Sequence, residues 1–142
     1  MEKCTQMNEI ELEQTNAEAE RLLNLCDKLS TQMWNENKKG EYFKLKLLSQ
    51  RISEIRHKVW LARDLLNFCD NVRGSDLECG FKSFANRHLN NLIVELNIDI
   101  FYNKSQQYDS FQFMELAFDW VNVCSFYKNY YAPKIDFARC AE

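Results

Sequence analysis

Residues 45–69 read LKLLSQRISEIRHKVWLARDLLNFC, and their apolar residues recur at alternating spacings of three and four. The members of this seam are Leu45, Leu48, Ile52, Ile55, Val59, Ala62, Leu66 and Cys69. The spacing places them along one side of an α-helix and predicts close packing against a parallel or antiparallel helix, as in a coiled coil. A second apolar stripe predicts contact with a further neighbour and consists of Phe43, Leu47, Trp60, Leu61 and Phe68.

Helical patterns extend from this segment in both directions along the chain. We expect four helices, at about residues 8–37, 41–72, 76–103 and 109–131, followed by a tail at about 132–142. The first two patterns are the longest, so a long helical hairpin opens the chain. The connections between the helices are short, which makes sequential helices antiparallel neighbours.

The predicted helix ends are set by residues that favour caps and turns. Asn8 and Ser75 are placed to cap the first and third helices, and Asp109 or Ser110 to cap the fourth. Gly40 follows the first helix, where a residue in the left-handed conformation commonly ends a helix.

The composition favours an all-α protein. The 142 residues include only 3 Gly and 1 Pro, which are too few to supply the turns of a β-rich or α/β fold. A chain of this length suits one domain with its own core. We therefore predict a single helical domain, residues 1–142, that folds as an antiparallel up-down-up-down four-helix bundle.

Charge is distributed unevenly between the first two predicted helices. Residues 1–37 carry 3 basic and 8 acidic groups, whereas residues 38–73 carry 9 basic and 4 acidic groups. This asymmetry predicts ion pairs between the two helices. It also leaves open an anion-binding surface for nucleic acid or phospholipid, for which the candidates are Lys44, Arg51, Lys58 and Arg63.

The residues that catalysis or metal binding generally requires are scarce. The two histidines are His57 and His88, and the sequence contains neither a glycine-rich phosphate loop nor a Gly-x-Ser-x-Gly motif. Glu54-x-x-His57 matches half of a di-iron carboxylate motif, but the chain holds no second copy. We expect a core position for His88, no catalytic residue, no metal ligand and no cofactor, and therefore a protein that is not an enzyme.

The termini and cysteines predict an intracellular protein, cytoplasmic or nuclear. The polar start of the chain does not resemble a signal peptide, and no apolar run reaches the length of a membrane span. The six cysteines form no Cys-x-x-Cys pair, and three of them, Cys26, Cys69 and Cys124, stand at core spacings. We expect free, mostly buried thiols.

Aromatic residues are concentrated near the C-terminus, where residues 101–137 hold 12 of the 19 Phe, Trp and Tyr residues. On a helical wheel, the fourth helix is apolar over roughly 200°, about twice the width of an ordinary core-facing stripe. Its surplus can pack inside the bundle, meet a partner protein or line a pocket for an apolar ligand. The candidate interface residues are Phe111, Phe118, Phe126, Tyr127, Tyr130, Tyr131 and, on the second helix, Trp60.

The leading interpretation is a non-catalytic protein–protein interaction module: an adaptor, an oligomerising protein or a subunit of a complex. Its partner is another protein chain, which makes a homo- or hetero-oligomer. A helical bundle that binds a hydrophobic ligand or lipid is the first alternative. A nucleic-acid-associated protein that uses the basic second helix is the second alternative, and it is disfavoured because the acidic first helix can pair with those cations.

Overall fold

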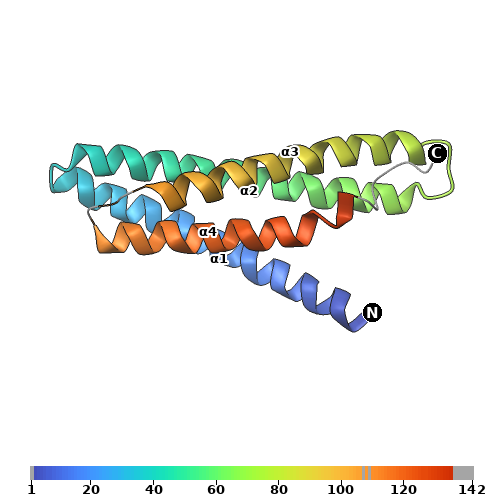
Figure 1. Cartoon of the computed structure of the whole chain (residues 1–142), viewed down its shortest axis with the longest axis horizontal. Coiled ribbons are helices and arrows are strands. Elements are labelled where there is room, and N and C mark those ends of the chain that lie inside the picture. Colours follow the sequence, from blue (N-terminus) through green and yellow to red (C-terminus); the bar gives the residue numbers. More distant parts are fainter. Residues whose placement is uncertain (1, 107, 109, 136–142) are drawn as a thin grey trace.

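The protein is an all-α bundle of four helices (Figure 1). The computed structural model describes residues 2–106, 108 and 110–135. The helices are α1, Glu2–Asn35; α2, Lys39–Asn71; α3, Glu78–Ser105; and α4, Phe111–Tyr131. No strand occurs within the described ranges, which confirms the predicted class.

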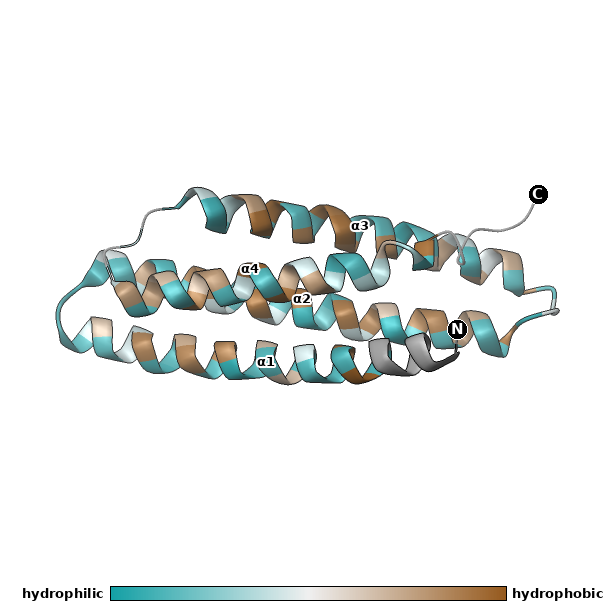
Figure 2. Cartoon of the chain, turned by 60° about the horizontal axis from the view of Figure 1, so that its bottom comes forward, coloured by the Kyte–Doolittle hydropathy of each residue, from teal (hydrophilic) through white to brown (hydrophobic). Residues whose placement is uncertain are grey.

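Sequential helices run side by side in opposite directions, and the long α1–α2 hairpin packs beside the α3–α4 hairpin (Figures 1 and 2). Each helix packs mainly on two neighbours, because α1 contacts α2 and α4, and α3 contacts α2 and α4. The diagonal pairs touch far less. This arrangement confirms the antiparallel four-helix bundle.

The seam of α2 forms the centre of the apolar core. Seven of its eight predicted members are buried, and Leu65 is buried in place of Leu66, which is half-buried beside the core. Matching apolar residues of α1 and α3 complete this part of the core and are Leu22, Cys26, Leu29, Leu89, Leu92 and Leu96. Hydrophobic residues accordingly recur along the helices in Figure 2.

The largest buried side chains belong to α4. Trp120, Tyr127 and Tyr131 are at most 1% exposed, and Phe113 is also buried. The Tyr127 hydroxyl donates a 2.6 Å hydrogen bond to Asn16 Oδ1 on α1, which satisfies a polar group that burial would otherwise leave unpaired. Much of the aromatic surplus therefore fills the inside of the bundle.

The helix ends differ in places from the predictions. Asn8 lies inside α1 rather than at its cap, and Gly40 is already part of α2. The left-handed residue that ends α1 is Asn37, with φ 63°, a conformation that Asn tolerates better than most residues. Asn37 thus performs the role predicted for Gly40.

Of the other two predicted caps, the one at Ser110 is confirmed, whereas the one at Ser75 is wrong, because the N-cap position of α3 is Leu77, which makes no side-chain capping hydrogen bond. Ser110 caps α4, because its side-chain oxygen accepts a hydrogen bond from the backbone N–H of Phe113. Near α3, Ser75 Oγ accepts a hydrogen bond from the N–H of Leu77, and the Glu78 carboxylate accepts one from the N–H of Gly74. Asp109 and residues 136–142 of the predicted tail lie outside the described residues.

None of the described helices combines the length and apolarity that a membrane span requires.

Shortening a core side chain should destabilise the bundle far more than shortening an exposed one on the same helix. Leu92 is fully buried, and Leu92→Ala is expected to lower the free energy of unfolding by about 2–5 kcal/mol, because it leaves a cavity. Val94 is 55% exposed, so Val94→Ala should cost no more than about 0.5 kcal/mol. Urea unfolding measures both, and equal losses would contradict this packing.

Candidate functional site

A buried charge network joins α2, α3 and α4. Asp99 on α3 is only 3% exposed, and its Oδ1 accepts a 2.8 Å hydrogen bond from Arg51 Nε on α2. A second guanidinium nitrogen, Arg51 Nη2, lies 2.6 Å from the same oxygen. The indole N–H of Trp120 on α4 donates to Asp99 Oδ2 at 3.0 Å. A buried carboxylate needs such partners, because loss of hydration strongly disfavours an isolated charge.

The network continues to the surface through Glu95 and Glu54. Arg51 Nη2 donates to Glu95 Oε2 at 2.8 Å, and Arg51 Nη1 donates to Glu54 Oε2 at 3.1 Å. Lys58 Nζ lies 3.8 Å from the other Glu95 oxygen. The hydrogen bond from Arg51 lowers the pKa of Glu95 against the opposing effect of partial burial. Arg51 is thus the hub of three carboxylates on two helices.

A cavity of about 350 Å³ opens beside this network, between α2, α3 and the α3–α4 connection. Its apolar lining consists of Leu47, Leu48, Ile98, Tyr102, Tyr108 and Phe113. Leu48 and Phe113 are buried and form the inner wall with Asp99, whereas Leu47, Ile98 and Tyr102 are exposed and form the mouth. The cavity therefore extends from the surface to the edge of the core.

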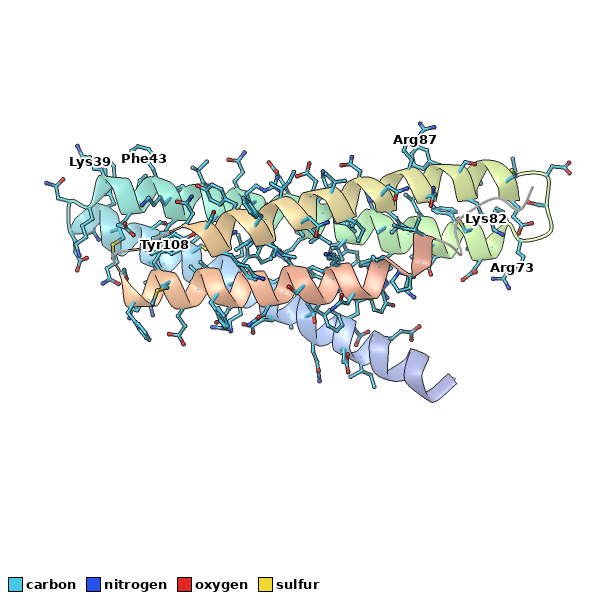
Figure 3. The ribbon with its side chains drawn as sticks, viewed as in Figure 1. Lys39, Phe43, Arg73, Lys82, Arg87 and Tyr108 are labelled. Carbon is cyan, nitrogen blue, oxygen red and sulfur yellow. The ribbon has the colours of Figure 1, made fainter. Side chains whose placement is uncertain are left out.

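Tyr108 forms part of the cavity wall (Figure 3). Its ring stacks on Phe113 with the centroids 4.2 Å apart, and its hydroxyl donates a 3.1 Å hydrogen bond to Asn103 Oδ1. The Asn103 amide donates in turn to the backbone carbonyl of Asp99 at 2.8 Å. Burial, with smaller contributions from Tyr102 and Glu41, raises the pKa of Tyr108 to about 12, so the hydroxyl stays protonated at neutral pH.

Exposed apolar side chains lie at the cavity mouth and beside it on α2 and α3. We call this the α2–α3 apolar surface, and its members are Phe43, Leu47, Val94, Ile98, Phe101 and Tyr102. All six are more than half exposed. Ile98 and Tyr102 line the cavity, and together with Val94 and Phe101 they also line an adjoining hollow on α3. The four α3 members therefore form one continuous surface that includes part of the cavity mouth.

Part of this surface was predicted from the sequence as an apolar stripe, but the stripe was expected to pack on a helix of the same chain. Phe43 and Leu47 belong to the second stripe of α2, which was expected to pack on a neighbouring helix. Every member of that stripe is exposed. Helix α2 does contact a second neighbour, α3, but through residues nearer the seam, including Arg51 and Lys58.

The predicted aromatic interface residues do not form one surface. Phe111, Phe118 and Trp60 are exposed, and Phe126 and Tyr130 are half-buried. Tyr127 and Tyr131 are buried in the core, where their rings fill space between the helices. Because they are buried, a partner protein cannot contact them, and the prediction that they form an interface is wrong. Phe111 and Phe118 instead form an exposed stripe on α4 with Met114, which we call the α4 stripe.

The predicted anion-binding residues are also divided. Arg51 and Lys58 pair with carboxylates of α3, and Arg63 lies over the Trp60 ring at 5.8 Å. Lys44 is 3.9 Å from Glu41 on its own helix. The main ionic partners of α2 are therefore on α3 rather than on α1, which corrects the expected pairing, although Lys46 does approach Asp27 of α1 at 4.0 Å.

The histidines and cysteines of the described residues are not grouped into a site. His57 is exposed, and Nε2 of the half-buried His88 donates a 2.9 Å hydrogen bond to the Lys58 carbonyl. Cys26, Cys69 and Cys124 are buried free thiols, as predicted. Cys79 is disulfide-bonded, which corrects the expectation for that residue. Among the described residues, no group of three or more His, Cys, Asp and Glu could hold a metal ion.

Comparison with known proteins finds no matching family model, no matching curated protein and no matching solved structure.

Removing the Asp99 carboxylate should destabilise the protein strongly. Asp99→Ala leaves the Arg51 Nε–H and the buried Trp120 indole N–H without their acceptor, and we expect a loss of about 3 kcal/mol in the free energy of unfolding. The matched control is Asp27→Ala, which removes an exposed carboxylate and should cost at most about 1 kcal/mol. Comparable losses in urea unfolding would contradict a structural role for the network.

The pH dependence of stability should include a contribution from Glu95. Its pKa is lowered in the folded state, so its stabilising effect is fully present above the ordinary value of 4.5 and disappears as the pH falls through the folded value. The difference in unfolding free energy between the wild type and Glu95→Gln should therefore shrink between pH 7 and pH 3. Glu115→Gln, at an exposed position on α4, serves as the control, and a pH-independent difference for Glu95→Gln would refute this assignment.

Proposed function

We propose that the chain is a non-catalytic interaction module that binds another protein through the α2–α3 apolar surface. The observation that carries this proposal is a group of exposed apolar side chains around one cavity mouth and the hollow that adjoins it, formed by Leu47, Val94, Ile98, Phe101 and Tyr102. Contiguous exposed apolar patches, especially with aromatic members, are typical of protein interfaces. Antiparallel helices also form a groove in which a partner helix can pack.

The charges around this surface favour an acidic partner. Lys39 stands one helical turn before Phe43, and the two side chains lie together on the outer side of α2 in Figure 3. Lys104 stands three residues after Phe101 on α3. Neither lysine forms an ion pair within the described ranges, whereas the nearby Glu54 and Glu95 are paired with Arg51. The partner segment should therefore combine apolar side chains with carboxylates.

A nucleic-acid role for α2 has weaker support. Arg51 and Lys58, two of its four candidate cations, are held by carboxylates of α3. A phosphate that approached them would have to compete with ion pairs that are partly removed from solvent. The apolar surface, by contrast, needs no rearrangement before a partner can reach it.

Site-specific photo-crosslinking in the native cells tests the proposed interface. A photoreactive amino acid at Phe101, which is 76% exposed, should form a discrete adduct with one acidic protein. The double change Leu47→Glu/Ile98→Glu should reduce the adduct at least about tenfold, because it places charges at the centre of the contact. The absence of any protein adduct would contradict the proposal.

The α4 stripe supplies the matched control. Phe111→Glu/Phe118→Glu introduces the same number of charges at similarly exposed apolar positions and should leave the Phe101 adduct unchanged. Equal loss of the adduct in both double variants would show that the contact is not specific to α2 and α3.

A further inference from the structure

We infer that the cavity between α2, α3 and the α3–α4 connection binds a medium-chain amphiphile: an alkyl body with a carboxylate head group. This inference goes beyond the proposed interface, because it assigns a small-molecule site to the space beneath the surface. Ligand sites commonly combine an apolar wall with a few placed polar groups, and this cavity has that composition.

The size of the cavity limits the ligand. An apolar cavity of about 150 Å³ holds benzene, which has six carbon atoms. The cavity here measures about 350 Å³, which by the same ratio accommodates about fourteen non-hydrogen atoms. Decanoate, with about twelve, fits this volume. Its alkyl chain matches the apolar wall formed by Leu47, Leu48, Ile98 and Phe113.

The polar groups that already have partners do not bind the ligand. Asp99 and Arg51 are engaged with each other, with Trp120 and with the surface carboxylates. The Asn103 amide N–H₂ and carbonyl oxygen bond Asp99 and Tyr108, respectively. The inner end of the cavity therefore suits an apolar chain, which forms no hydrogen bonds.

Besides the hydroxyl of the exposed Tyr102, two polar groups of the lining are available to a ligand. Gln106 makes no side-chain hydrogen bond with any part of the chain that the structure describes, so its amide N–H₂ group can donate. Lys44 Nζ forms an ion pair with Glu41 Oε1 at 3.9 Å, which is beyond hydrogen-bond distance, so its N–H groups have no hydrogen-bond acceptor within the part of the chain that the structure describes and can still donate. Because both groups supply donors, the head group should be rich in acceptors, as a carboxylate is.

Glu41 is not among the residues that line this cavity, although it is close enough to the wall residue Tyr108 to contribute to the raised pKa of that hydroxyl. It lines a separate hollow with Met33, Lys38, Gly40 and Ser110, and Lys44 is the residue common to both spaces. Lys44 thus lines the cavity and is at the same time ion-paired with the buried Glu41 carboxylate. The positive charge of Lys44 would repel a cationic head group and attract an anionic one. The site should therefore bind an alkyl carboxylate more tightly than an alkyl amine.

Calorimetric titration of the full chain with decanoate, decanol and decylamine tests the inference. We expect decanoate to bind most tightly, decanol about five- to tenfold more weakly, and decylamine weakest of the three. No detectable binding of decanoate, or binding of decylamine at least as tight, would overturn the assignment.

Two variants locate the binding site. Lys44→Gln should weaken decanoate binding about five- to tenfold and leave decanol binding unchanged, because only the carboxylate uses the ammonium charge. Ile98→Trp places a larger ring at the exposed mouth and should abolish binding of both ligands. Unchanged decanoate affinity in Ile98→Trp would mean that the ligand binds elsewhere and would overturn the inference.

The outcome is separable from that of the proposed interface. Lys44→Gln keeps every apolar member of the α2–α3 apolar surface, so the Phe101 adduct should persist in this variant even though decanoate binding falls. If the Phe101 adduct forms in the wild type and decanoate does not bind, only the ligand assignment fails. If decanoate binds as predicted and no Phe101 adduct forms, only the proposed interface fails.

Discussion

The pairing of Arg51 with Asp99 is the interaction on which the rest of the structure depends. It places a charge pair across α2 and α3, and the Trp120 indole extends it to α4. A buried ion pair adds little net stability over a well-packed apolar pair, but leaving either charge unpaired is strongly unfavourable. We infer that the network fixes the register of three helices, because a shift along either helix axis would separate the charges.

The sequence predicted the helices and the core well because their signals are local. The alternating seam of residues 45–69 requires no knowledge of the partner helix, and it identified nearly all buried positions of α2. The network was missed because an ion pair between residues 48 positions apart in the sequence has no local signature. The available signal was Asp99 itself, which stands three residues after Leu96 on a helix face whose other buried members are all apolar.

The candidate surface was predicted less well because a helical wheel does not show where the neighbours lie. The fourth helix has the widest apolar arc, yet Trp120, Tyr127 and Tyr131 fill the bundle rather than its surface. The second stripe of α2 was predicted to contact a further neighbouring helix, although Phe43 and Leu47 are exposed. The number of helices limits how many apolar faces can be buried, and four helices in a square leave the outer sides of α2 and α3 uncovered.

Hydrogen exchange at the three tryptophan indoles tests most directly whether Asp99 and Trp120 hold the centre of the bundle. Trp120 is fully buried, whereas Trp34 and Trp60 are more than half exposed. NMR spectroscopy, with the indole signals assigned by single Trp→Phe variants, should show that the Trp120 N–H exchanges at least about a thousandfold more slowly than the other two. Exchange at Trp120 as fast as at Trp34 and Trp60 would contradict this account of the fold.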